Sequence, residues 1–238
     1  MNKFPKHEYH IPYSKAEIVP DSEVVYSSIG IEENVTIPPE IEHLYNEALL
    51  LFQKLVEPKG FLKPIGIEEF KIILEGEGEN DGAIPLELIT ERGVFIALFI
   101  ATLGANVSSK IEELIKEKDY PLGHMLDTIA SRSAEKATEI GEKYFLKEIK
   151  NNFSLNNQKV LLYSPGYCGW NVTAQKKIFK FLQPEKIGIA LNGSSLMTPI
   201  KSVSGVLISG ERDIHKFRMI YPFCKTCQTF SCRERIKN

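Results

Sequence analysis

The sequence lacks the features that would place the chain in a membrane or on nucleic acid. Its longest apolar run, residues 94–103, has about half of the ~20 residues that a membrane-spanning helix needs. Residues 1–7 lack the apolar stretch of a signal peptide. The formal net charge is −2 at pH 7, whereas a general nucleic-acid binder carries a basic face. We therefore expect a cytoplasmic protein with neither a membrane nor a nucleic-acid partner.

Short catalytic signatures are also missing. The chain contains no G-x-S-x-G elbow, no phosphate-binding G-x-x-x-x-G-K, no H-E-x-x-H and no G-x-G-x-x-G. The acidic residues 75–82 lack the ordered spacing of a calcium-binding loop, so we expect them to form a solvated turn. The residues by themselves therefore assign no catalytic group.

Cysteine is scarce and clustered. Of four cysteines, three lie within nine residues near the C-terminus (Cys224, Cys227 and Cys232), and the fourth is Cys168. Two residues between Cys224 and Cys227 allow one turn to direct both thiolates at one metal ion. Without an export signal, a disulfide framework is not expected, and the four thiols match a tetrathiolate site for zinc or an iron–sulfur cluster. A reduced thiol cluster or a redox pair is the alternative.

The hydrophobic pattern predicts an α+β domain, because several helices follow one another without an intervening strand. We expect an N-terminal arm (1–39) lying over the domain, the domain itself (40–215) and a cysteine-rich tail (216–238). The expected helices cover residues 39–55, 108–118, 121–149 and a stretch from 173. The expected strands are 24–26, 70–74, 94–103 as the central strand, 160–163, and a hairpin of 195–197 with 202–208 across Pro199.

The segment after residues 160–163 is the most informative part of the chain. An apolar run leads into Ser164-Pro165-Gly166-Tyr167, and Cys168 and the single tryptophan, Trp170, follow. Glycine can adopt positive φ and lets another molecule approach the main chain closely. The turn is therefore a candidate ligand site, with a tight strand-to-helix turn and a packed tryptophan as the alternative.

Two segments together resemble the reactivation domain of cobalamin-dependent methionine synthase. In that family, the sequence motif of the turn is Arg-x-x-x-Gly-Tyr. The motif of a later segment is Ser-Phe-x-Met-x-Pro-x-x-Ser-Val-Ser-Gly. In this chain the later segment keeps seven residues in register, namely Ser195, Met197, Pro199, Ser202, Val203, Ser204 and Gly205. Residues 102–104 and 126–131 resemble stand-alone relatives of the domain. The resemblance covers about residues 90–210, and the cysteine tail is absent from the methionine synthase domain.

The resemblance implies a C-shaped single α+β domain with a central twisted antiparallel sheet flanked by helices. It also implies that the protein acts next to a corrinoid cofactor, during the reductive methylation of cob(II)alamin by S-adenosylmethionine. Ser164, Gly166 and Tyr167 inherit the family's S-adenosylmethionine-binding turn, with the tyrosine near the corrin. Glu135 falls where the family places an acidic residue near the ligand's amino group, and Trp170 is expected to approach the corrin beside the turn.

One position departs from the family pattern. The arginine that meets the ligand's carboxylate corresponds to Leu162 in this chain. A guanidinium binds a carboxylate through two parallel hydrogen bonds, and leucine offers none.

Two functions follow from these observations. The first is a stand-alone partner of a corrinoid methyltransferase or methionine synthase core, a component of a cobalamin-dependent methyltransferase system that supports methyl transfer or reactivation. If an iron–sulfur cluster includes Cys168, it would adjoin the corrin-facing turn. The second is a non-catalytic adaptor with a metal-stapled tail that binds a corrinoid protein.

Overall fold

A central antiparallel sheet organises the chain in the computed structural model, which describes residues 4–32, 34–153, 155, 157–216 and 221. The strand order is β1-β2-β3-β7-β4, and every neighbouring pair is antiparallel. The strands are β1 (Tyr9–His10), β2 (Lys59–Pro64), β3 (Phe95–Thr102), β4 (Gln158–Tyr163) and β7 (Ser202–Glu211). The expected α+β class is confirmed, and so is the central strand, since β3 occupies the middle of the sheet.

Helices cover both faces of this sheet, which explains why β3 is buried along almost its whole length. On one side, α6 (Tyr120–Phe153) packs on the sheet, and α1 (Ser22–Ser28), α2 (Pro39–Leu55) and α5 (Ala105–Lys116) pack against α6. The other carries α3 (Ile67–Glu75), α4 (Pro85–Arg92) and α7 (Gln175–Leu182). Successive side chains of β3 alternate between the two cores: Ala97 and Phe99 belong to the first, Leu98 and Ile100 to the second.

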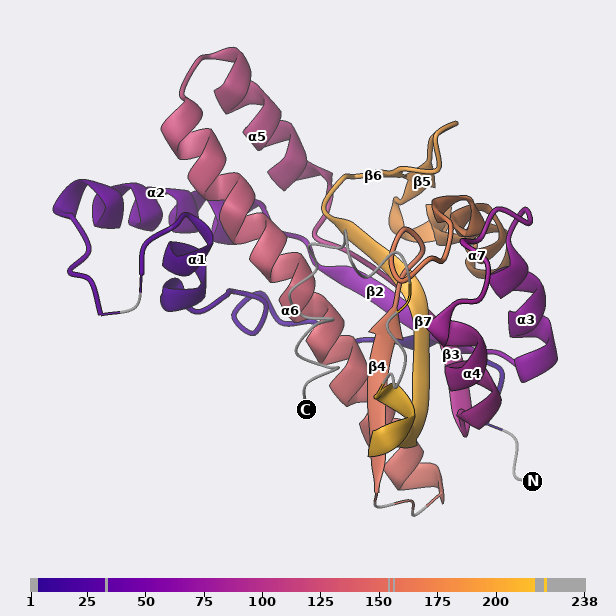
Figure 1. The fold of residues 1–238 in the computed structure, drawn as a ribbon. Coiled ribbons are helices and arrows are strands. Elements are labelled where there is room, and N and C mark those ends of the chain that lie inside the picture. Colours follow the sequence, from indigo (N-terminus) through magenta and orange to yellow (C-terminus); the bar gives the residue numbers. More distant parts are fainter. Residues whose placement is uncertain (1–3, 33, 154, 156, 217–220, 222–238) are drawn as a thin grey trace.

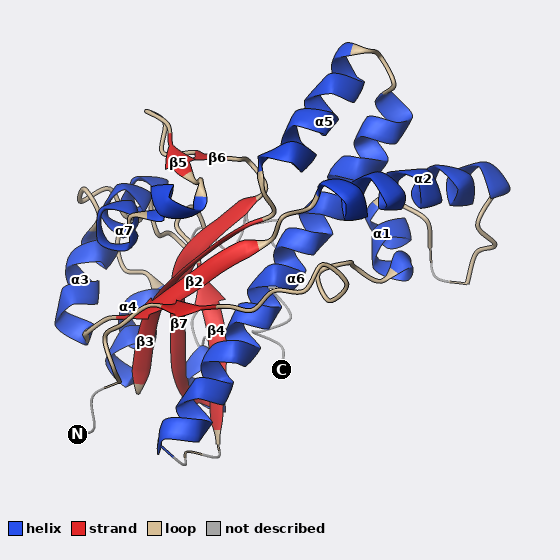
Figure 2. Cartoon of the chain, turned by 180° about the vertical axis from the view of Figure 1, so that it is seen from behind, coloured by secondary structure: helices blue, strands red, loops and turns tan. Residues whose placement is uncertain are grey.

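The longest helix sets the outline of the molecule. Helix α6 runs along the sheet, while its first part and α5 extend away from the strands as an arm (Figures 1 and 2). Together with the opposite lobe of α3, α4 and α7, this arm gives the C-shaped outline that we expected. Among the described residues, no helix is long and apolar enough to cross a bilayer.

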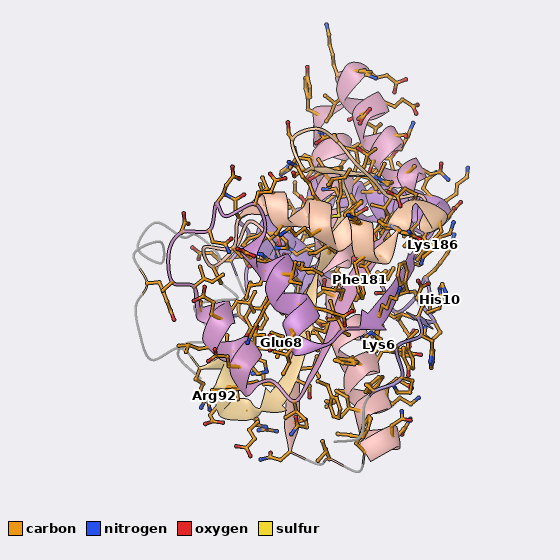
Figure 3. The ribbon with its side chains drawn as sticks, turned by 90° about the vertical axis from the view of Figure 1, so that its right-hand side faces the viewer. Lys6, His10, Glu68, Arg92, Phe181 and Lys186 are labelled. Atoms are coloured by element: carbon orange, nitrogen blue, oxygen red, sulfur yellow. The ribbon has the colours of Figure 1, made fainter. Side chains whose placement is uncertain are left out.

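The N-terminal segment contributes to the core, contrary to our expectation of an arm lying over it. Ile18 and Val25 are fully buried, and β1 adds an edge strand to the sheet. Residues 24–26, predicted as a strand, lie in α1, which exposes Val24 and buries Val25. Lys6, which Figure 3 labels, also pairs with Glu69 of α3 at 2.6 Å.

The strand predicted at residues 70–74 is also wrong, because these residues belong to α3. Phe70, Ile73 and Leu74 are buried, a spacing of three and four residues that matches one face of a helix. The Glu69 carboxylate accepts a hydrogen bond from the Gly66 backbone N–H at 3.3 Å. This contact satisfies a donor at the helix N-terminus and places negative charge at the positive end of the helix dipole.

The predicted hairpin across Pro199 does not form. Strand β6 (Met197–Thr198) pairs with β5 (Ala190–Leu191), whereas β7 pairs with β3 and β4. The Asn192 side-chain oxygen accepts hydrogen bonds from the backbone N–H groups of Ser194 at 3.0 Å and Leu196 at 2.9 Å. These hydrogen bonds to the Asn192 side chain stabilise a turn that reverses the chain direction between β5 and β6, before Pro199. Three short 3-10 helices complete the fold: η1 (Val172–Ala174), η2 (Pro184–Ile187) and η3 (Arg212–His215).

Candidate functional site

The turn that connects β4 to η1 and α7 is tightly folded. The Gly166 backbone N–H donates to the Trp170 carbonyl oxygen at 2.7 Å, and the Trp170 N–H donates to the Tyr167 carbonyl oxygen at 3.0 Å. Gly166, Cys168 and Gly169 all have positive φ, at 91°, 54° and 76°. Two of the three are glycines, the residue that adopts this conformation without steric cost.

The first part of this turn is open. A Cβ atom at Gly166 would meet no other atom within 4 Å, so the main chain there is accessible. The side chain of the next residue, Tyr167, is 54% exposed, and Ser164 is half-buried. Gly166 and Tyr167 therefore present an accessible backbone beside an exposed aromatic ring. We name Ser164, Gly166 and Tyr167 the open turn.

The far end of the turn is closed. Trp170 is 1% exposed and packs edge-to-face on Phe70, with ring centroids 5.9 Å apart. The expectation that Trp170 approaches a corrin is therefore wrong, because its ring lies in the core between the sheet and α3. A large aromatic side chain at this point anchors the turn by burial.

The two motifs of the family resemblance meet beneath the open turn. Gly205 of β7 lies against the Tyr163 carbonyl oxygen, where a Cβ atom would clash with the backbone. The hydroxyl of Ser204 donates to the Gln175 side-chain oxygen at 2.9 Å, in buried surroundings. The Ser-Val-Ser-Gly segment thus holds both ends of the connection, Tyr163 at its start and Gln175 at the beginning of α7.

Glu135 lies on α6 with a side chain that is 62% exposed. Ser131, Glu135 and Glu142 are spaced four and seven residues apart, so they share one side of the helix. Ser131 accepts a hydrogen bond from Lys201 at 2.8 Å, and Glu142 accepts one from the backbone N–H of Leu162 at 2.7 Å. Glu135 lies between these two contacts along α6 and pairs with Arg132, at 2.7 Å.

Leu162, which the family resemblance aligns with an arginine, lies on edge strand β4. Its side chain is 6% exposed and belongs to the core between the sheet and α6. The carboxylate of Glu142 accepts a hydrogen bond from its backbone N–H. This position therefore offers an aliphatic side chain and a nearby carboxylate in place of a guanidinium. A leucine side chain offers no hydrogen bond to a ligand carboxylate.

The structure describes one of the four predicted metal ligands. Cys168 is half-buried and follows Tyr167 in the turn, while Cys224, Cys227 and Cys232 lie outside the described residues. Within the described part of the chain, no group of three or more His, Cys, Asp or Glu side chains is arranged to hold a metal ion. The four-cysteine site remains a prediction.

Sequence reasoning missed the contribution of residues 76–84, the loop between α3 and α4. The loop is largely exposed, as we expected of a solvated turn, and it is also hydrogen-bonded to the far end of the β4–α7 connection through Glu79, Asn80 and Asp81. The loop also borders an open cavity of about 520 Å³ between α3 and α4. The cavity is lined by Lys71, Leu74, Glu75, Gly78, Asn80, Glu87, Thr90 and Glu91. No sequence signal pairs residue 80 with residue 171, because 91 positions separate them.

The antiparallel sheet, flanked by helices and with a projecting helical arm, has the fold of a methionine synthase reactivation domain. The fold is similar to that of a solved structure described as "Crystal Structure of the MetH Reactivation Domain bound to AdoHcy". The similarity has a TM-score of 0.60 at 17% sequence identity and covers 90% of this chain and 80% of that chain.

The sequence profile of the family "Vitamin B12 dependent methionine synthase, activation domain" matches residues 88–219. The chain belongs to this family. The matched residues include α6, the open turn and the Ser-Val-Ser-Gly segment of β7. Comparison with curated proteins gives no match.

Proposed function

We propose that the chain is a stand-alone partner of a corrinoid methyltransferase of the methionine synthase type, supporting cobalamin-dependent methyl transfer or the reactivation of cob(II)alamin. The observation that carries this proposal is the open turn. A Cβ atom placed on Gly166 would have no neighbour within 4 Å, and Tyr167 is 54% exposed. Membership in the methionine synthase activation-domain family supports the same role.

The proposed roles of the two proteins differ. Cobalamin, carried by the partner, supplies the methyl-transfer chemistry, and this chain supplies positioning. In the proposal, the accessible backbone at Gly166 and the ring of Tyr167 meet the corrin. We assign Ser164 and Glu135 to this surface as its polar groups. In the proposal, they contact a small-molecule ligand bound beside the corrin. The carboxylate of Glu135 also favours a cationic group there.

S-adenosylmethionine has no assigned role in the proposal. The structurally similar reactivation domain was solved with AdoHcy bound. In this chain, Leu162 is buried and its N–H is held by the Glu142 carboxylate, so the charge that would pair with an amino-acid carboxylate is missing. We therefore propose that the open turn serves the corrinoid partner and does not bind S-adenosylmethionine through an arginine fork.

The test is binding to the cobalamin-loaded core of a methionine synthase, measured by calorimetry while the cobalamin absorption spectrum is followed. We expect wild-type protein to bind and to change the spectrum. Tyr167→Ala should weaken binding about tenfold, the loss expected for a central aromatic contact. Tyr120 is 58% exposed at the start of α6, so Tyr120→Ala is a matched control that should bind like wild type.

Two outcomes would count against this function. Absence of binding by the wild-type protein contradicts it directly. Equal affinity of Tyr167→Ala and wild type would remove the open turn from the interface. Binding that leaves both the cobalamin spectrum and the rate of methionine formation unchanged would favour the alternative, a non-catalytic adaptor.

We also propose that residues 216–238 form a metal-binding tail whose cysteines join Cys168 as ligands. The support is the position of Cys168, half-buried in the turn directly after Tyr167. A cytoplasmic location, which we propose as well, would keep these thiols reduced and available to a metal. A bound iron–sulfur cluster would place a redox centre next to the corrin-facing residues. Bound zinc would instead have a structural role and connect the tail to the turn that contains Cys168.

Elemental analysis of anaerobically purified protein tests the metal site. We expect about one equivalent of zinc, or iron with visible absorbance, and a clear loss of metal in Cys168→Ser. Ser164→Ala alters the same turn without removing a thiol, so it serves as the control and should retain the metal. Wild-type protein that contains neither iron nor zinc would eliminate the site.

A further inference from the structure

Residue Asn80 connects two parts of the molecule through both ends of its side-chain amide. Its Oδ1 accepts a hydrogen bond from the Asn171 backbone N–H at 2.9 Å. Its Nδ2 donates to the Leu74 carbonyl oxygen at 2.8 Å, at the C-terminal end of α3. Asparagine is suited to this position because one planar group offers an acceptor on one side and donors on the other.

Neighbouring residues of the same loop strengthen this connection. The Asp81 backbone N–H donates to the Gly169 carbonyl oxygen at 3.1 Å. The Asn171 side chain donates back to the Glu79 carbonyl oxygen at 3.1 Å, and the Thr173 hydroxyl donates to the Glu79 carboxylate at 3.2 Å. Residues 79–81 are therefore hydrogen-bonded to residues 169–173 through backbone and side chains alike.

Packing adds to these hydrogen bonds. A Cβ atom at Gly76 would lie 3.4 Å from the Cβ of Ala174, so the loop approaches η1 closely. Trp170 packs on Phe70 of α3, and Lys176 pairs with Glu77 at 2.9 Å. The second half of the β4–α7 connection is held from α3 and its following loop, while Gly166 and Tyr167 in the first half remain accessible.

The hydrogen bonds inside the turn carry this constraint to the open turn. The Trp170 carbonyl oxygen accepts from the Gly166 N–H at 2.7 Å, and the Trp170 N–H donates to the Tyr167 carbonyl oxygen. Trp170 is flanked by Gly169 and Asn171, both bound to the loop. A shift of Asn171 would therefore move Trp170 and, through it, Gly166.

We propose that Asn80 is a positioning residue that fixes the conformation of the open turn, so that Gly166 and Tyr167 are presented to the partner already in their binding geometry. The inference rests on the proposed function for its consequence in binding. A preformed turn loses less conformational entropy on association than a mobile one. Asn80 acts on Gly166 and Tyr167 through Asn171 and Trp170.

Hydrogen–deuterium exchange of the whole chain tests the conformational part. In Asn80→Ala both side-chain hydrogen bonds are lost. We expect the amides of residues 166–171 to exchange about tenfold faster, because only the bond to the Asn171 N–H reaches this segment, and one such bond contributes a net free energy near the ~1.4 kcal/mol that corresponds to tenfold. Asn80→Asp keeps the acceptor for Asn171 but opposes an oxygen to the Leu74 carbonyl, so an intermediate effect is expected. Asn46→Ala, at an exposed position of α2, is the control.

Trp170, the only tryptophan, gives a second readout through its fluorescence, which should shift in Asn80→Ala and stay unchanged in Asn46→Ala. Unchanged exchange in residues 166–171 of Asn80→Ala would overturn the inference. If Asn80→Ala does not fold, as thermal unfolding would reveal, Asn80→Asp decides by the same measurement.

Affinity for the cobalamin-loaded methionine synthase core separates this inference from the proposed function. We expect Asn80→Ala to bind about tenfold more weakly than wild type, with Asn80→Asp in between. Wild-type protein that fails to bind overturns the proposed function, and the exchange data still decide whether Asn80 fixes the turn. Wild-type binding together with equally tight binding by Asn80→Ala overturns the positioning role.

Discussion

The Glu142 carboxylate accepts a hydrogen bond from the Leu162 backbone N–H at 2.7 Å, which ties α6 to the edge strand next to the open turn. An acidic group therefore lies beside Leu162, the residue that the family resemblance aligns with a ligand-binding arginine. At this position a neutral side chain is found in place of the expected cation, and an anion is nearby. Recognition of an amino-acid carboxylate is disfavoured at this point by both.

From this relationship we expect no saturable heat when S-adenosylmethionine is titrated into the wild-type protein up to about 1 mM. Loss of one charged hydrogen-bonding partner typically costs about 2–5 kcal/mol in binding. We expect the upper end of this range because an anion lies nearby, and about 4 kcal/mol weakens a micromolar ligand to about 1 mM. The AdoHcy-binding reactivation domain is the positive control. Micromolar affinity in this chain would show that another residue replaces the arginine.

Gly205→Ala should destabilise the fold by about 1–3 kcal/mol, the usual cost of forcing extra volume into a packed interior. The added Cβ would meet the Tyr163 backbone, which is fixed in the sheet and cannot rotate away. Denaturant unfolding measures the change. Gly193→Ala is the matched control, because a Cβ there meets nothing within 4 Å. Equal stability of the two variants would contradict the close approach of β7 to Tyr163.

Trp170 should be protected from solvent, since it is 1% exposed and packs on Phe70. We expect blue-shifted tryptophan emission that acrylamide and iodide quench poorly in the native state and strongly after unfolding. The signal comes from one residue, because the chain has a single tryptophan. Efficient quenching in the folded protein would show that Trp170 is exposed, and a contact between Trp170 and the corrin would again be possible.

Tyr13 should make the protein sensitive to alkali. Burial raises the pKa of Tyr13 above the ordinary tyrosine value of 10.0, and its hydroxyl donates to the Ala137 carbonyl oxygen at 3.0 Å. Because the pKa is raised in the folded state, the contribution of Tyr13 to stability is complete below about pH 10 and is lost as the pH rises beyond it.

Unfolding of Tyr13→Phe compared with wild type checks this expectation. Near pH 7 we expect the variant to be about 1 kcal/mol less stable, because one hydrogen bond is lost. Above about pH 10 the wild-type stability should fall more steeply than that of the variant. Parallel pH profiles would show that Tyr13 does not titrate with unfolding.

Local sequence patterns correctly predicted the helices and strands whose own residues favour a single type of secondary structure. Helix α2 begins at Pro39, a favoured first residue of a helix, and its apolar residues recur at helical spacing up to Leu55. The run of apolar residues in β3 predicted a central strand, because only a strand covered on both faces is apolar at every position. The glycine–tyrosine turn was found in the same way, from Ser164, Gly166 and the preceding apolar run.

Elements whose structure depends on distant partners were missed. Strand β2 was not predicted, since Lys59 and Pro64 at its ends break the apolar pattern and its hydrogen bonds go to β3. Residues 70–74 have strand-forming side chains, yet the capping contact at Gly66 and the packing against the sheet select a helix.

The sequence alone determined the α+β class, the family and a candidate turn after residues 160–163, because periodicity and short motifs are properties of neighbouring residues. Only the tertiary structure decided which side of the turn is accessible. It buried Trp170 against Phe70, set Glu142 beside Leu162 and brought Asn80 to Asn171. The physical reason is that burial and hydrogen-bond partners depend on which segments the fold packs together, and these segments lie 20 to 91 positions apart in the chain for the two hydrogen-bonded pairs.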